Sequence, residues 1–154
     1  MSGTLYGIGL GPGDPELLTL KAVRILSNVP AIAFPVPDSG HSMARAIAAP
    51  YLRPGLAEIG FGLCMRIDSA PGQAAYDDAA DAIAARLQGG EDVALLCEGD
   101  PFFYGSFLYL FERLAGRFRV DIVPGISSPM AAAAAMRTPP VSYTHLTLPT
   151  ILLV

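Results

Sequence analysis

Three short segments rich in glycine, proline and small polar residues carry the residue types that could bind a ligand. They read GLGPGDPE at positions 9–16, CEGDPFFYGS at 97–106 and VPGISSP at 123–129. Glycine permits positive φ angles and close approach of the backbone, while carboxylates and hydroxyls supply hydrogen-bonding groups. No Ser-His-Asp arrangement, metal-ligand cluster or paired basic phosphate site accompanies them in the sequence. The three segments therefore suit a neutral or cationic ligand with adenosine-like hydrogen-bonding groups.

The first segment does not match the two common nucleotide motifs. Asp14 occupies the third glycine position of a G-x-G-x-x-G fingerprint, so a carboxylate fills the helix N-terminus that a pyrophosphate would need. The Walker A pattern fails because no Gly-Lys-Ser/Thr follows. Two interpretations stay open for this segment: a tight turn whose helix is capped by Asp14 and Pro15, or a backbone cradle for a ligand that is not a phosphate.

The second and third segments also have local explanations. Asp100 can cap a helix that begins at Pro101, with Phe103 in the core, but capping does not explain why Glu98 ends a hydrophobic strand. In the third segment, Ser128 as N-cap followed by Pro129 predicts the start of an alanine-rich helix. A binding role for its hydroxyls and backbone N–H groups is an equal alternative.

Apolar runs and helical patterns alternate along the chain and would position these turns. Strands are predicted at 5–10, 30–36, 58–64, 92–97 and 119–123, because these runs are short and apolar on both faces. This order predicts an α/β fold with a mostly parallel five-stranded sheet flanked by helices. Ligands of such sheets bind beyond the carboxyl ends of the strands, so the three segments should line one cleft.

The predicted helices span 16–26, 41–49 and 73–87, followed by one after the second segment and one after Ser128. Helical spacing predicts which residues each of them buries. For the first helix these are Leu17, Leu20 and Val23; for the third, Tyr76, Ala80, Ile83 and Leu87; for the fourth, Phe103, Phe107, Leu110 and Leu114.

Composition excludes several classes of protein. The chain has 154 residues, 52% of them hydrophobic and 16% charged, with a net charge of −4, which argues against disorder and against a nucleic-acid partner. The longest uncharged stretch, 138–154, is shorter than a membrane span and is broken by prolines. Cys64 and Cys97 suggest neither a disulfide framework nor a zinc site. We expect no membrane association and a cytoplasmic location.

Three motifs in this order resemble those of the tetrapyrrole methylases. LYGIGLGPGDPELLTLKA at 5–22 resembles the N-terminal signature of that family, EGDPFFYGS at 98–106 its Gly-Asp-Pro loop, and VPGISS at 123–128 its third turn. Within the family, residues 1–26 and 96–114 look most like the precorrin-2 C20-methyltransferases. The resemblance covers about residues 4–140.

The resemblance implies an S-adenosylmethionine-dependent methyltransferase of cobalamin synthesis that converts precorrin-2 to precorrin-3A. The methyl donor would lie between two domains, and the full-length protein would be a homodimer. No metal and no catalytic base is implied. Carried over from the family motifs, the donor-binding residues are Pro12, Glu98, Gly99, Asp100, Phe103, Ser127 and Ser128.

Other functions remain open. The acceptor could be the cobalt-containing counterpart of precorrin-2, or another tetrapyrrole methylated at a different carbon. From a different class, the chain could be a non-catalytic module that binds an adenosyl ligand. Arg45, Arg66 and Arg137 are candidates for holding the carboxylates of the acceptor, with ordinary surface positions as the alternative.

The end of the chain departs from the family. We expect a tetrapyrrole methylase N-terminal domain over 1–140 and, over 141–154, an uncharged tail that resembles translated adapter sequence and is artefactual. The second domain of the family is then missing. We expect the 154-residue fragment alone to be inactive, with a genuine short protein as the alternative.

Overall fold

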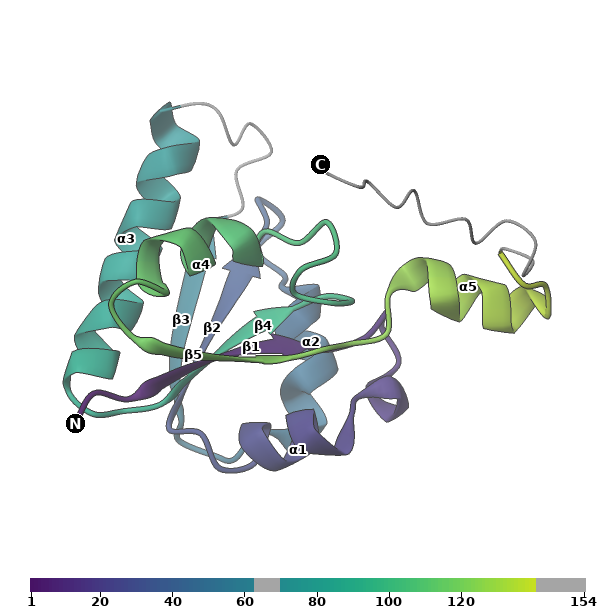
Figure 1. Cartoon of the computed structure of the whole chain (residues 1–154), viewed down its shortest axis with the longest axis horizontal. Coiled ribbons are helices and arrows are strands. Elements are labelled where there is room, and N and C mark those ends of the chain that lie inside the picture. Colours follow the sequence, from purple (N-terminus) through teal and green to yellow (C-terminus); the bar gives the residue numbers. More distant parts are fainter. Residues whose placement is uncertain (63–69, 141–154) are drawn as a thin grey trace, which may run out of the picture.

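The computed structural model describes residues 1–62 and 70–140 and contains a five-stranded parallel sheet. The strands lie in the order β3-β2-β4-β1-β5 (Figure 1). The predicted α/β fold with a parallel five-stranded sheet is thereby confirmed. The strands are β1 (Thr4–Gly9), β2 (Ala31–Val36), β3 (Ala57–Gly62), β4 (Val93–Cys97) and β5 (Arg119–Val123).

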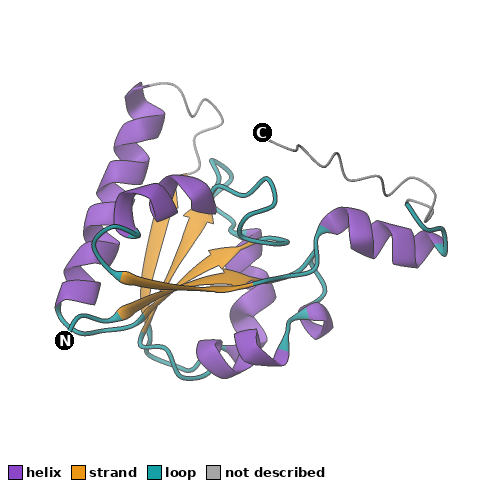
Figure 2. Ribbon diagram, in the orientation of Figure 1, coloured by secondary structure: helices purple, strands orange, loops and turns teal. Residues whose placement is uncertain are grey.

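Helices cover both faces of the sheet (Figure 2). One face packs against α1 (Leu20–Leu26) and α2 (Met43–Ala48), the other against α3 (Ala70–Gln88) and α4 (Phe107–Leu114). Side chains alternate along each strand: in β4, Leu95 packs toward α3 and α4, while its neighbours Ala94 and Leu96 pack toward α1 and α2. Burial on both faces explains why the strands are continuous apolar runs.

Strands β1 and β4 are neighbours in the sheet, and the connections that follow them run toward opposite edges of the sheet. The chain leaves β1 toward β2 through α1 on one face, and leaves β4 toward β5 through α4 on the other. The segments that follow these two strands therefore diverge at the sheet's C-terminal edge. In open α/β sheets this divergence opens a crevice where ligands bind.

The start of the first helical segment differs from the prediction. A single helix over 16–26 is wrong: a 3₁₀ helix, η1 (Pro15–Leu17), capped by the Asp14 side chain, is separated from α1 by Leu18 and Thr19. Thr19 caps α1 by accepting a hydrogen bond from the amide of Ala22. This restart changes which residues face inward: Leu20 is 89% exposed, while Leu18, Ala22 and Leu26 are buried.

The helix after the second segment also begins later than predicted. Residues 101–106 form turns, and α4 starts at Phe107, so Phe103 is 51% exposed and does not join the core. The predicted inward positions Phe107, Leu110 and Leu114 are confirmed, as are all four predicted for α3. The second predicted helix, 41–49, is shorter at both ends: Ser42 caps α2, and a 3₁₀ helix, η2 (Ala49–Tyr51), follows it.

The last helix, α5 (Ser128–Met136), projects away from the sheet (Figure 1). Its N-cap is Ser127, not Ser128 as predicted, and Pro129 occupies the second helical position. None of its residues is buried against the described part of the chain, although the helix is almost entirely apolar. Within the described ranges, no helix is long and apolar enough to cross a membrane.

Some predictions fall outside the described residues. These are the end of the third predicted strand at 63–64, Arg66, and the tail at 141–154. The domain boundary at residue 140 stays a prediction.

Candidate functional site

An open pocket of about 450 Å³ lies at the C-terminal edge of the sheet, where the segments after β1, β4 and β5 meet. All seven residues that the sequence motifs nominated line it together, although they come from three distant parts of the chain. Two further lining residues, Tyr104 and Pro129, were not predicted. The lining consists of Pro12, Glu98, Gly99, Asp100, Phe103, Tyr104, Ser127, Ser128 and Pro129.

The three segments touch one another through glycine backbone. A side chain at Gly125 would overlap the carbonyl oxygen of Gly99 and approach the backbone of Gly9 within 2.8 Å. A side chain at Gly9 would in turn overlap the amide of Gly125. Since all of these neighbours are backbone atoms, no rotamer change could make room. We call the contact between Gly9, Gly99 and Gly125 the pocket floor; of these three glycines, Gly99 lines the pocket itself.

A short antiparallel bridge ties the first segment to the second. The Gly11 amide donates to the Gly99 carbonyl oxygen at 3.2 Å, and the Gly99 amide donates to the Gly11 carbonyl oxygen at 2.7 Å. Both residues have positive φ, 75° and 67°, which residues with a side chain rarely adopt. The bridge therefore holds the backbone of the first segment against that of the second.

Asp100 connects the second segment to the third. One carboxylate oxygen accepts from the Phe102 amide at 2.9 Å, and the other accepts from the Gly125 amide at 3.0 Å. The first of these bonds lies within a turn: the predicted helix start at Pro101 is wrong, because residues 101–106 form turns and α4 begins only at Phe107. The second, across 25 residues, is a tertiary contact, so Asp100 fixes the position of the third segment with both of its oxygens in use.

Glu98 is the second carboxylate of the pocket and, unlike Asp100, has no partner in the described chain. It is exposed and forms no hydrogen bond or ion pair with residues 1–62 or 70–140. It follows Cys97, the last residue of the buried strand β4, which places its carboxylate at the pocket and not in the core. Glu98 is thus available to accept hydrogen bonds from a ligand or to face a positive charge.

The third segment contributes hydroxyls and the start of a helix. Ser127 caps α5 by position, but its side chain makes no capping hydrogen bond. In the first turn of α5, Pro129 has no N–H group and the Met130 amide donates to the Ser127 carbonyl oxygen, which leaves the Ser128 amide without an acceptor in the described chain. Ser127 and Ser128 therefore offer both donors and acceptors to a bound molecule.

Aromatic side chains form the remaining wall. Phe102 packs edge-on against Phe107 and Phe111 of α4, with ring centroids 5.6 and 5.3 Å apart, whereas Phe103 and Tyr104 line the pocket. Tyr104 was missed because, of the three adjacent aromatics, only Phe103 was given a role, as a core residue of a helix or as a donor-binding residue. A run of three adjacent aromatics was the available signal, since one face of a helix cannot bury all three.

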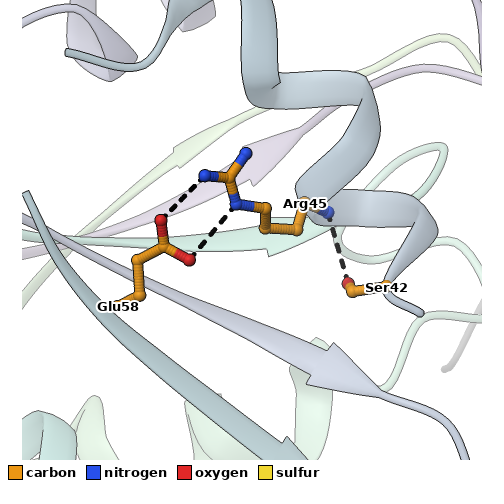
Figure 3. A network of polar contacts seen from close by, with 3 residues as sticks. All are labelled: Ser42, Arg45 and Glu58. Carbon is orange, nitrogen blue, oxygen red and sulfur yellow. Dashed lines mark hydrogen bonds and ion pairs between the residues drawn. The ribbon is translucent and has the colours of Figure 1, made fainter. Parts of the chain in front are cut away.

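A second, smaller hollow of about 270 Å³ lies between β2 and the start of α2 and includes His41 and Arg45. Figure 3 shows that the Arg45 guanidinium is paired with Glu58 through two hydrogen bonds, at 2.8 and 3.2 Å. Hydrogen bonding to Glu58 raises the pKa of Arg45. The same residue's amide donates to the hydroxyl of Ser42, the cap of α2.

The arginines nominated for acceptor carboxylates do not gather at the pocket. Arg45 belongs to the smaller hollow and is paired. Arg137 follows the last residue of α5, about 13 Å along the helix axis from Ser128. Arg66 lies outside the described residues.

Cys97 does not belong to the pocket either. Its side chain is buried on the α3 and α4 face of the sheet, and this burial raises the pKa of the thiol well above its ordinary value. Among the described residues, no group of three or more His, Cys, Asp or Glu side chains could hold a metal ion.

The doubly wound sheet, with a pocket of backbone, hydroxyl and carboxylate groups at its switch point, defines an α/β ligand-binding domain. The chain belongs to the family of Tetrapyrrole (Corrin/Porphyrin) Methylases, whose model matches residues 4–149.

Individual relatives are similar to most of this chain. The cobalamin biosynthesis protein CobIJ of Mycobacterium tuberculosis is 48% identical over 145 residues, which cover 89% of this chain and 28% of the relative. A precorrin-2 C(20)-methyltransferase of Sinorhizobium sp is 41% identical, covering 82% of this chain and 55% of the relative. The uroporphyrin-III C-methyl transferase of Thermus thermophilus, solved with S-adenyl homocysteine, superposes with a TM-score of 0.61 at 26% identity, covering 85% and 48% of the two chains.

The chain thus spans about a quarter of CobIJ and about half of the other two relatives.

Proposed function

We propose that the pocket binds S-adenosylmethionine and that the protein is a methyltransferase acting on precorrin-2 at C20. One observation carries the proposal: the seven residues nominated by the family motifs converge on a single pocket at the sheet's switch point. The 41% identity to a precorrin-2 C(20)-methyltransferase supports the choice of acceptor. Methylation of precorrin-2 at C20 would give precorrin-3A as the product. We also propose that the complete protein is a homodimer located in the cytoplasm.

The chemistry of the pocket fits this donor. A volume of about 450 Å³ lies within the usual range for small-molecule sites. Glu98 carries an unpaired negative charge, which favours a cationic sulfonium or the hydroxyls of a ribose. The serine hydroxyls and the N-terminus of α5 provide groups for the polar edges of the ligand. S-adenosylmethionine supplies an electrophilic methyl group when bound.

The residues of this chain hold the donor in position. Asp100 and the pocket floor hold the three segments together, so the groups that contact the donor are fixed before it binds. Methyl transfer depends on holding the reacting atoms about 3–3.5 Å apart in line. A rigid backbone cradle meets that requirement without an acid or base from these segments.

Calorimetry on the 154-residue chain tests the donor site. S-adenosylhomocysteine should bind at one site per chain, while a dinucleotide such as NAD should not, because Asp14 occupies the helix N-terminus that a pyrophosphate requires. Absence of S-adenosylhomocysteine binding, or equal binding of NAD, would refute the donor site.

Turnover separates a methyltransferase from a binding module. We expect donor binding without methyl transfer by this chain, because it spans about half of the similar precorrin-2 methyltransferase. Methylation of precorrin-2 by the chain alone would contradict that expectation. Supplying metal-free and cobalt-containing acceptors to the complete protein would decide between the two substrates.

A further inference from the structure

Tyr104 has an unusual backbone conformation for a bulky residue. Its φ is 57°, in the left-handed region, and its side chain is 98% exposed. The other non-glycine residue with positive φ in the described chain, Arg137, follows the end of a helix, where this conformation is common. Tyr104 ends no helix. A strained residue at a pocket points to a functional role, because the strain must be maintained by the surrounding structure.

The loop around Tyr104 holds the strained residue in place. Phe102 anchors the loop on α4 through Phe107 and Phe111. On the other side, a side chain at Gly105 would lie 3.0 Å from the carbonyl oxygen of Pro101, which is a tight contact with backbone. The loop is therefore built to present the next two rings away from its anchor.

The rings of Phe103 and Tyr104 differ in how much of each is exposed. Phe103 is half-exposed and Tyr104 almost fully exposed, and their centroids are 5.0 Å apart with the planes at 85°. Both line the pocket. A ring that is 98% exposed stands at the pocket rim, not inside it. It is placed to contact a molecule that reaches the pocket from outside after the donor has bound.

We infer that Tyr104 positions the methyl acceptor by packing its ring against the conjugated face of the tetrapyrrole. The inference rests on the proposed function, because methyl transfer brings the acceptor to the mouth of the donor pocket. None of the nine described lining residues is basic, so the acceptor's carboxylates have no cationic partner there. Contact at this rim is then made with the ring system, for which an aromatic side chain is suited.

Fluorescence titration tests the inference on the 154-residue chain saturated with S-adenosylhomocysteine, with uroporphyrin III as the probe. Tyr104→Phe keeps the ring and should bind the porphyrin within about twofold of the unsubstituted chain. Tyr104→Gly should bind at least about fivefold more weakly, the lower end of what aromatic stacking contributes. Glycine adopts positive φ freely, so this variant relieves backbone strain and should fold. Leu20→Ala, at an exposed apolar residue of α1, controls for non-specific adsorption.

The inference is overturned if Tyr104→Gly binds the porphyrin as the unsubstituted chain does, if that chain does not bind it, or if Leu20→Ala weakens binding equally. Donor affinity measured on the same samples distinguishes the two proposals. Porphyrin results of this kind with intact S-adenosylhomocysteine binding would remove only the role of Tyr104. Loss of S-adenosylhomocysteine binding by the unsubstituted chain would remove the proposed function and this inference with it.

Discussion

The pocket floor and helix α5 are stabilised in opposite ways, although Gly125 of the floor lies only three residues before the helix. At the floor, a side chain at Gly9 or Gly125 would overlap backbone atoms, and Gly99 supplies the carbonyl oxygen that a side chain at Gly125 would meet. Three residues after Gly125, α5 begins, and none of its residues is buried against the described chain. Two of the three floor glycines have no space for an added atom, while α5 has almost no packing to lose.

This difference shows which contacts determine the geometry of the site. The floor and Asp100 connect the three segments to each other, so the site is fixed by backbone contacts between distant parts of the chain. Helix α5 contributes its first residues to the pocket and little to the stability of the described domain. Substitutions in the two regions should therefore differ sharply in their effect.

The largest effect is expected at the floor. Gly125→Ala should lower the free energy of unfolding by about 3 kcal/mol, because the new methyl group overlaps backbone that cannot rotate away. Chemical denaturation measures this change. Gly116→Ala is the matched control, since a side chain there meets nothing within 4 Å, and it should change stability by less than about 0.5 kcal/mol. Similar values for the two variants would mean that the floor is not tightly packed.

A smaller loss is expected when the connection between the second and third segments is cut. Asp100→Ala leaves the amides of Phe102 and Gly125 without their acceptor and should cost about 1–3 kcal/mol of stability. It should also weaken S-adenosylhomocysteine binding, because the third segment loses its anchor. Asp78→Ala, at an exposed aspartate of α3, should do neither. An Asp100→Ala variant as stable as Asp78→Ala would contradict the structural role of Asp100.

Glu98 should affect binding without affecting folding. Glu98→Gln removes the charge that would face the sulfonium of the donor, so we expect stability within about 0.5 kcal/mol of the unsubstituted chain and an affinity for S-adenosylmethionine reduced about fivefold. Calorimetry and denaturation give the two values. Glu112→Gln, at an exposed glutamate of α4, serves as the control for a general charge effect. Unchanged affinity in Glu98→Gln would exclude a role for this carboxylate in binding.

The smallest effect is expected in α5. Met130→Lys places a charge on an apolar helix, yet it should change the stability of the chain by less than about 0.5 kcal/mol because Met130 is 53% exposed. By contrast, Leu110→Ala in α4 removes a fully buried side chain and should cost about 2–5 kcal/mol. A destabilisation by Met130→Lys comparable to that of Leu110→Ala would show that α5 is packed in solution.

Much of the fold follows from local patterns. Strands buried on both faces are continuous apolar runs, and the spacing of Tyr76, Ala80, Ile83 and Leu87 identified the inner face of α3. The same reasoning failed for the first helix, because three leucines occur within four residues. Which leucine faces inward depends on α1 beginning after its N-cap Thr19. A cap in the middle of an apolar run is a weak signal in the sequence.

The site could be predicted only in part. Motif resemblance identified seven residues of the pocket, but not their roles. That Asp100 bonds to Gly125, or that the glycines touch each other, depends on contacts across the sheet that no local pattern contains. Tyr104 was missed for a related reason, since its exposure results from a turn where a helix was expected.

Amide chemical-shift mapping of the ¹⁵N-labelled chain during titration with S-adenosylhomocysteine tests the central claim most directly. The account predicts that the largest shifts occur at the amides of Glu98, Gly99, Ser127 and Ser128. The amide signals of Gly116, which follows α4, and of Met136, the last residue of α5, should not shift. Shifts centred instead on His41, Ser42 and Arg45, which line the smaller hollow, would place the ligand elsewhere. That result, or the absence of any shift at the pocket, would contradict the account.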